Sequence, residues 1–139
     1  VRAFLNAAFF RKLPPKSLDR NSFPQIVKSV AHLNDADGAA TLCAIVAATV
    51  ATGMEHMPAP VSQVLVCGGG RHNPVIMSML RAELGVSVLE VEHHELNGDM
   101  LEAQAFAYLA ARVLSKRPTS GPSTTGAPVF VGGGELARP

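Results

Sequence analysis

VSQVLVCGGGRHNPVIMSMLRAELG, residues 61–85, carries the strongest structural signals in this sequence. Its first part, residues 61–67, is largely apolar and rich in β-branched valine, which predicts a strand. After three glycines come the signals of a helix. Asn73 suits the N-cap, Pro74 suits the first helical position, and Gly85 suits a left-handed stop. The stretch therefore predicts a strand, a glycine turn and a helix in immediate succession.

The glycine turn, Gly68, Gly69 and Gly70, is the candidate ligand site. Because glycine has no Cβ, a ligand can lie directly against the main chain. Open amides at the positive end of a helix dipole favour phosphate or the sugar edge of a nucleotide. The pattern GxGxxN lacks the last glycine of the dinucleotide fingerprint, and no GK[ST] follows. A turn that only connects a strand to a helix is the alternative that the pattern leaves open.

Composition predicts one domain with one core, because the chain has 139 residues and 47% hydrophobic content. A net charge of +1, with 17% charged residues, argues against a nucleic-acid partner. The longest uncharged stretch, residues 38–54, predicts a buried helix rather than a membrane span. Cys43 and Cys67 lie in apolar surroundings, outside any paired metal-ligand spacing. We expect them to be buried free thiols in a reducing compartment.

Apolar spacing predicts further elements on both sides of the central stretch. They are a short amphipathic helix over 1–12, one or two helical turns over 25–33, a long and mostly buried helix over 38–56 with N-cap candidates at 34–37, a strand over 86–91, a helix over 99–116 and a short strand over 129–131. The two strands joined through a helix predict a parallel crossover. Three short strands leave an unpartnered edge, so we expect the sheet to continue in residues outside this chain.

Two further groups of residues could carry chemistry. His93 and His94 stand beside Glu95, but neighbours on a loop point apart and no third ligand follows at a metal-site interval. We therefore expect a surface turn there and no metal site. Asp99 and Glu102 have the spacing of a capping box at the start of the helix over 99–116. Glu102 thus has a structural explanation beside any catalytic one.

Four separated segments resemble the C-terminal part of the anhydro-N-acetylmuramic acid kinase family: PPKSLDRNSF, VLVCGGGRHNPVIMSMLRAELG, DMLEAQAFAYLAARVLS and GPSTTGAP. The resemblance runs in register from about residue 4 to the end. It implies an α/β chain that forms a partial ribonuclease H-like lobe of the actin, Hsp70 and sugar-kinase superfamily. Residues 1–139 would be the C-terminal nucleotide-binding portion of a two-lobe cytoplasmic kinase.

The resemblance also implies a reaction and roles for residues. The family uses ATP with Mg²⁺ to phosphorylate 1,6-anhydro-N-acetylmuramic acid while water opens the anhydro bridge, giving N-acetylmuramic acid 6-phosphate for cell-wall recycling. The glycine turn would support the adenosine and inner phosphates, and Asn73 would contact nucleotide or cap the helix. Glu102 would reach toward the amino sugar and the attacking water. Lys16 and Ser17 match the family's PPKS loop, which carries no assigned role.

Departures from the family pattern limit what this chain can do alone. The DSGTSMDG-like phosphate segment and the aspartate expected as general base are absent from the sequence, so we expect the isolated chain to need an N-terminal lobe for turnover. HHEL also stands where relatives commonly read TDEL, and the tail VFVGGGELARP is altered.

Two other classes of protein stay open. A Rossmann-type NAD or FAD module would use an acidic residue at the end of the second strand, Glu90 or Glu92, to bind ribose. A non-catalytic assembly domain would dock a partner or a second copy on its exposed sheet edge. We expect neither a membrane nor a nucleic acid as partner.

Overall fold

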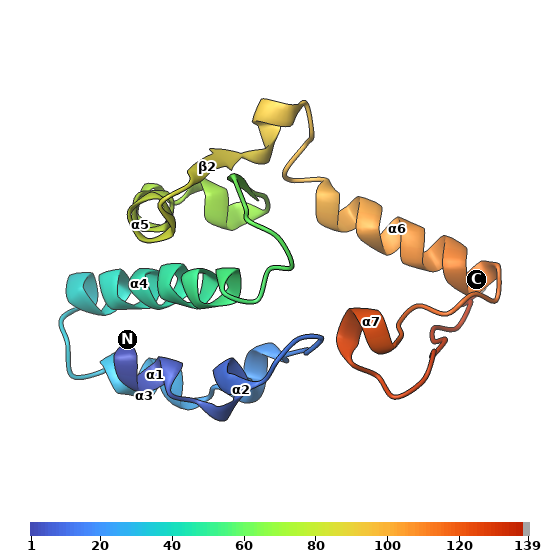
Figure 1. Ribbon diagram of the computed structural model, residues 1–139, viewed down its shortest axis with the longest axis horizontal. Coiled ribbons are helices and arrows are strands. Elements are labelled where there is room, and N and C mark those ends of the chain that lie inside the picture. The colour runs from blue at the N-terminus through green and yellow to red at the C-terminus, as the bar shows by residue number, and fades with distance from the viewer. Residues whose placement is uncertain (138–139) are drawn as a thin grey trace.

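The computed structural model describes residues 1–137, which form several helices and a small two-stranded parallel sheet (Figure 1). The helices are α1 Arg2–Leu5, α2 Ala8–Arg11, α3 Gln25–Val30, α4 Asp35–Met54, α5 Pro74–Leu84, α6 Leu101–Leu114 and α7 Pro122–Thr125, and the strands are β1 Gln63–Val66 and β2 Ser87–Glu90. Short 3₁₀ turns occupy Arg20–Ser22, Gly69–His72 and Val91–His94. The predicted α/β class is confirmed.

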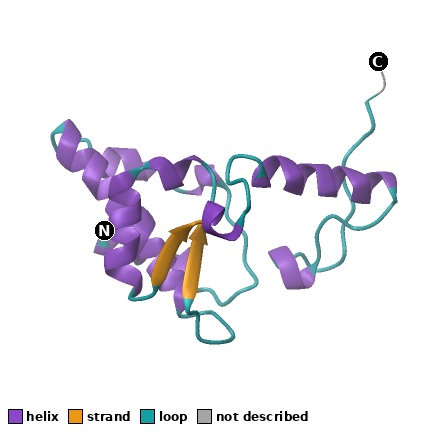
Figure 2. Cartoon of the chain, turned by 90° about the horizontal axis from the view of Figure 1, so that it is seen from above, coloured by secondary structure: helices purple, strands orange, loops and turns teal. Residues whose placement is uncertain are grey.

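The central unit runs from β1 through α5 to β2, as the sequence predicts. The two strands pair in parallel, with Gln63 opposite Ser87 and Val66 opposite Glu90 (Figure 2). Asn73 is the N-cap of α5, because its Oδ1 accepts hydrogen bonds from the amides of residues 75 and 76 at 3.0 and 3.3 Å. Gly85 ends the helix in the left-handed conformation, with φ of 63°.

The core lies where α4 and α5 pack together beside the sheet. Its buried residues are Ala47, Met77, Leu80 and Val88, with Val64, Val66, Ile76, Met79 and Leu84 packed around them. Leu65, which alternates with Val64 and Val66 along β1, is 39% exposed. The helices therefore cover the sheet face that carries Val64 and Val66.

Helix α4 begins and packs differently from the prediction. It starts at Asp35 because the Asn34 Oδ1 accepts from the Asp37 amide at 2.9 Å, which caps the first turn. The expectation of a mostly buried helix is wrong, since only Gly38, Ile45 and Ala47 of α4 are buried within the described chain. With 20 residues and a mean hydropathy of 1.4, α4 meets the length and composition of a membrane span. It packs against α5, α1 and α3, and one of its residues, Ala47, belongs to the core.

The predicted single helix over residues 1–12 is wrong, because the chain breaks between α1 and α2. Ala7 adopts an extended conformation, with φ of −59° and ψ of 143°. The break lets rings from both short helices gather at Phe23, whose ring centroid lies 4.7 Å from that of Phe4 in α1 and 6.5 and 5.8 Å from those of Phe9 and Phe10 in α2.

Helix α6 does not bury the face that its apolar spacing predicts. It leads away from the unit of α4, α5 and the sheet (Figure 1), and within residues 1–137 none of its residues is buried. Phe106 and Leu114 are each 64% exposed. The expected core face is therefore wrong for this chain, because the segment over residues 133–136 covers only part of it and leaves Phe106 exposed.

Two smaller expectations also fail. Residues 129–131 form no strand among the described residues, and Val131 instead makes one isolated antiparallel bridge to Ser120. Both cysteines are free within the described chain, but Cys67 is exposed and Cys43 is half-buried. Cys67 is exposed because it follows the last paired residue of β1, at the open end of the sheet.

We expect Leu80→Ala to lower the free energy of unfolding by about 2–5 kcal/mol, because it leaves a cavity between α4, α5 and β2. Leu80 is 3% exposed, whereas Leu96 is 45% exposed and serves as the matched control. Urea titration of both variants measures the difference. Equal losses for Leu80→Ala and Leu96→Ala would contradict the position of the core.

Candidate functional site

The glycine turn lies at the carboxyl end of β1 and is open. Gly68 has φ of 71° and ψ of −178°, a conformation that favours glycine. Apart from its two chain neighbours, a Cβ on Gly68, Gly69 or Gly70 would meet no atom of residues 1–137 within 4 Å. The helix does not follow at once, because the 3₁₀ turn Gly69–His72 separates Gly68 from α5. The main chain of the turn is thus uncovered on the side that a side chain would occupy.

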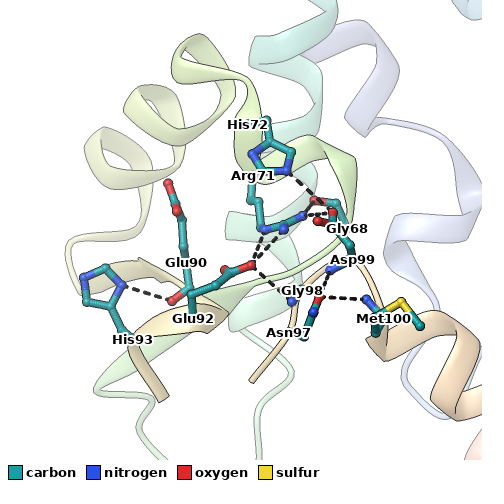
Figure 3. Close-up of polar contacts among 10 residues, drawn as sticks. All are labelled: Gly68, Arg71, His72, Glu90, Glu92, His93, Asn97, Gly98, Asp99 and Met100. Atoms are coloured by element: carbon teal, nitrogen blue, oxygen red, sulfur yellow. Dashed lines mark hydrogen bonds and ion pairs between the residues drawn. The ribbon is translucent and has the colours of Figure 1, made fainter. Parts of the chain in front are cut away.

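Arg71 directly follows the glycine turn, within the 3₁₀ turn Gly69–His72, and is buried, with 4% exposure. Its Nε donates to Glu92 Oε1 at 2.9 Å, and its Nη2 lies 2.7 Å from the same oxygen (Figure 3). Its Nη1 donates to Asp99 Oδ1 at 2.7 Å and to the carbonyl oxygen of Gly68 at 2.9 Å. One side chain therefore joins the glycine turn to the segment that follows β2.

Gly98 completes this arrangement because it allows the guanidinium to approach the main chain. A Cβ on Gly98 would lie 2.6 Å from Arg71 Nε and 2.8 Å from its Cζ. The Gly98 amide donates to Glu92 Oε1 at 3.1 Å, and its carbonyl accepts from the Gly68 amide at 3.0 Å. We call Gly68, Arg71, Glu92, Gly98 and Asp99 the arginine clamp.

The charges of the clamp stabilise one another. The hydrogen bonds that Arg71 donates to Asp99 and Glu92 raise the pKa of Arg71 above its ordinary value. The hydrogen bond from Arg71 lowers the pKa of Glu92, and the Asp99 pKa is lowered by Arg71 first and by His72, whose Nε2 is 3.6 Å from Asp99 Oδ1. All three groups are therefore charged at neutral pH.

The predicted capping box of Asp99 and Glu102 is wrong. Asp99 is paired with Arg71, and helix α6 begins one residue later than such a box requires, with Met100 at the N-cap. The Asn97 Oδ1 instead accepts from the Asp99 and Met100 amides at 3.0 and 3.2 Å. Glu102 is exposed in the first turn of α6, and within residues 1–137 its side chain takes part in no hydrogen bond.

The structure brings some predicted site residues together and leaves others apart. Asn73 caps α5, and its Nδ2 lies 3.9 Å from the Cys43 Sγ, so its capping role is confirmed and its contact with nucleotide stays a prediction. Lys16 points elsewhere, with its Nζ donating to the carbonyls of Phe9 and Lys12 at 3.1 and 2.9 Å. Glu102 shares no hydrogen bond with the glycine turn among the described residues.

The two neighbouring histidines follow β2 and turn to different partners. His93 Nδ1 lies 3.2 Å from the carbonyl oxygen of Glu90, and His94 Nε2 lies 2.7 Å from Gln63 Oε1. Over residues 1–137, no three His, Cys, Asp or Glu side chains form a group that could hold a metal ion.

Sequence reasoning missed Arg71, although a signal for it was present. Arg71 directly follows the three glycines after the first strand, and two acidic residues, Glu92 and Asp99, follow the next strand. Parallel pairing brings the carboxyl ends of both strands to one edge of the sheet. Arg71, after β1, is thereby brought close enough to the residues after β2 to form ion pairs with them.

A parallel β-α-β unit with an open glycine turn after its first strand is a geometry common among nucleotide-binding α/β proteins. Residues 1–136 match the family model described as anhydro-N-acetylmuramic acid kinase, and the chain belongs to that family.

Relatives in several bacteria agree with this assignment. The chain is 60% identical to an anhydro-N-acetylmuramic acid kinase of Cereibacter sphaeroides over 136 residues, which is 98% of this chain and 37% of the relative. A Ruegeria relative of the same name is 59% identical over 139 residues, covering 100% of this chain and 37% of the relative. A Zymomonas mobilis relative of the same name is 46% identical over 136 residues, with 98% and 37% covered. The chain thus spans little more than a third of the length of these relatives.

The clamp predicts how stability depends on pH. Folding lowers the pKa values of Glu92 and Asp99, so the folded state binds fewer protons at these groups than the unfolded state does. The clamp's contribution to the free energy of unfolding is therefore fully present above their ordinary pKa values of 4.5 and 3.8. That contribution is lost as the pH falls through the lowered values. We expect the free energy of unfolding to fall with acid more steeply in the wild type than in Arg71→Met, as measured by urea titration from neutral pH downward. Parallel pH profiles would contradict the ion pairs.

Proposed function

We propose that this chain supplies the nucleotide-binding portion of a two-lobe sugar kinase. The reaction is phosphorylation of 1,6-anhydro-N-acetylmuramic acid by ATP, with hydrolytic opening of the anhydro bridge to N-acetylmuramic acid 6-phosphate. The observation that carries the proposal is the uncovered glycine turn after β1, within the region that matches the kinase family. The two-stranded parallel sheet would be part of a larger ribonuclease H-like sheet.

The glycine turn would hold the adenosine and inner phosphates of ATP. The open space beside Gly68, Gly69 and Gly70 fits a ligand lying on the main chain, since side chains of residues 1–137 do not occupy it. Asn73, at the start of α5, would contact the same ligand through its side-chain nitrogen Nδ2, because its Oδ1 caps the helix. Mg²⁺ would neutralise charge on the phosphates during transfer.

The chain's own carboxylates beside the turn do not suit a role as Mg²⁺ ligands. Glu92 and Asp99 are already bound by the Arg71 guanidinium at 2.7 Å. A metal ion there would need to displace that cation. The phosphates and the part of the longer polypeptide outside this chain would therefore hold Mg²⁺. That part would also supply the general base and the first phosphate-binding segment. The isolated chain would bind nucleotide without turnover.

Glu102 would act on the sugar side of the reaction. Its carboxylate is exposed on the first turn of α6 and serves no capping function there. An acceptor on a rigid helix can hydrogen-bond a sugar hydroxyl or orient the attacking water.

The Rossmann alternative fits these residues less well. Glu92, one of the two candidates for binding ribose, is committed to Arg71. The other candidate, Glu90, lies at the end of β2 and is half-buried. Calorimetry with ATP and with NAD, using the full-length polypeptide that contains this chain, separates the two functions. We expect heat of binding with ATP only, and binding of NAD alone would overturn the kinase proposal.

We expect Gly69→Val to lower the affinity for ATP by about 100-fold or more, equivalent to roughly 2.7 kcal/mol, because the valine side chain fills the ligand's space. Gly69 lacks a positive φ and its Cβ direction is open, so the fold should tolerate the change. Gly53→Val is the matched control, since Gly53 is equally open and lies in another element, near the C-terminal end of α4. Calorimetry measures both variants, and unchanged ATP affinity in Gly69→Val would make the turn merely structural.

For Glu102→Gln in the full-length polypeptide, we expect kcat to fall by at least about tenfold with an unchanged free energy of unfolding. Glutamine keeps the size and one acceptor oxygen but removes the charge. Because α6 has no side-chain cap within the described residues, the substitution should not affect folding. Lost stability with unchanged turnover would instead assign Glu102 a structural role.

A further inference from the structure

We propose that Arg71 is a positioning residue that fixes the glycine turn in its ligand-accepting shape and joins it to the start of α6. The nucleotide part of this inference rests on the function proposed above. The mechanical part, which is the attachment of the turn to the segment after β2, rests on geometry alone.

The clamp connects two segments that are distant in the sequence. Arg71 and Glu92 are 21 residues apart, and Arg71 and Asp99 are 28 apart. The guanidinium reaches both carboxylates and also returns to the Gly68 carbonyl in its own turn (Figure 3). A second link joins the same segments through the main chain, from the Gly68 amide to the Gly98 carbonyl at 3.0 Å. The glycine turn is therefore attached to the segment after β2 by the Arg71 side chain and by the main chain of Gly68.

The planar fork of arginine suits these acceptors in a way that lysine does not. Nε and Nη2 both meet Glu92 Oε1, while Nη1 meets Asp99 and Gly68. An ammonium group is a single point charge and cannot match this directional pattern. Gly98 then provides the space, since a Cβ at that position would lie 2.6 Å from Arg71 Nε.

The same contacts argue that Arg71 acts through the turn and does not itself touch the ligand. Its side chain is 3% exposed, and its donors face protein acceptors. The open side of Gly69 and Gly70 lies along directions where their absent Cβ atoms would point. A phosphate bound there would meet main chain, while the guanidinium stays paired with its two carboxylates.

The clamp also joins the two segments to which ligand roles are proposed. Asp99 stands two residues before α6, and Glu102 lies in the first turn of that helix. Arg71 therefore ties the nucleotide-binding turn to the base of the helix that would carry the sugar contact. Loosening the clamp should change the relative position of ATP and sugar, which affects kcat as well as the KM for ATP.

The contacts predict a rank order among substitutions. Glu92 Oε1 accepts from Arg71 Nε and from the Gly98 amide and pairs with Nη2, whereas Asp99 Oδ1 accepts from one Arg71 nitrogen, Nη1, and lies 3.6 Å from the exposed His72 Nε2. Glu92→Gln should therefore disturb the turn more than Asp99→Asn, and Arg71→Met more than either. Arg71→Lys restores the charge without the fork, so its effect should lie between those of the wild type and Arg71→Met.

The test compares Arg71→Met with Arg81→Met in the full-length polypeptide. Arg81 lies on α5 and makes a single bond from its Nε to the Val88 carbonyl at 3.3 Å, so it is a matched control outside the site. Hydrogen exchange of the Gly68 and Asn73 amides, which donate to the carbonyls of Gly98 and Gly70, is measured without nucleotide, and calorimetry then gives the Kd for ATP. We expect Arg71→Met to speed exchange and raise the Kd by about tenfold each, as for the loss of a hydrogen bond to a charged group. Arg81→Met should leave both near the wild-type values.

The readouts keep this inference separate from the proposed function. Wild-type exchange rates in Arg71→Met, with the protein folded by circular dichroism, would overturn the clamp whatever the nucleotide result. A wild-type protein that does not bind ATP would overturn the proposed function, and the exchange comparison would still decide the mechanical role. Faster exchange with an unchanged Kd for ATP and an unchanged kcat would overturn the positioning role.

Discussion

The buried guanidinium of Arg71 is the interaction on which the rest of the site depends. A charged group can leave water only where acceptors surround it, because an unpaired buried charge is costly. That requirement accounts for the two carboxylates, for the carbonyl of Gly68 and for a glycine at position 98, where a side chain would collide with the guanidinium. The shape of the glycine turn is thus set largely by residues 20 to 30 positions later in the chain.

Local signals in the sequence predict the local structure well. Asn73 and Gly85 begin and end α5 as expected, and Asn34, one of the N-cap candidates, caps α4, because each acts on backbone groups within a few residues. The capping box of Asp99 and Glu102 fails for the opposite reason. Asp99 has a competing partner, Arg71, which lies 28 residues away in sequence and which spacing alone does not identify.

Features that depend on distant packing were predicted poorly. The apolar spacing of α6 is real, yet Phe106 remains 64% exposed because the described residues cover that face only in part. The expected strand over 129–131 is reduced to one bridge for a related reason, since a strand needs a neighbour with which to pair. Both findings fit our proposal that the chain works as one part of a longer kinase, in line with its coverage of 37% of its relatives.

The candidate site combines one feature visible in the sequence with one that emerges only in the fold. The glycine turn could be found from three consecutive glycines after an apolar run, but its attachment required the parallel register that brings the ends of β1 and β2 together. The most direct test is a crystal structure of the full-length polypeptide with Mg²⁺ and a non-hydrolysable ATP analogue. The account predicts the phosphates against the main chain of Gly68–Gly70, with Arg71 still paired to Glu92 and Asp99. A nucleotide bound elsewhere, or an Arg71 side chain turned outward to contact phosphate, would contradict it.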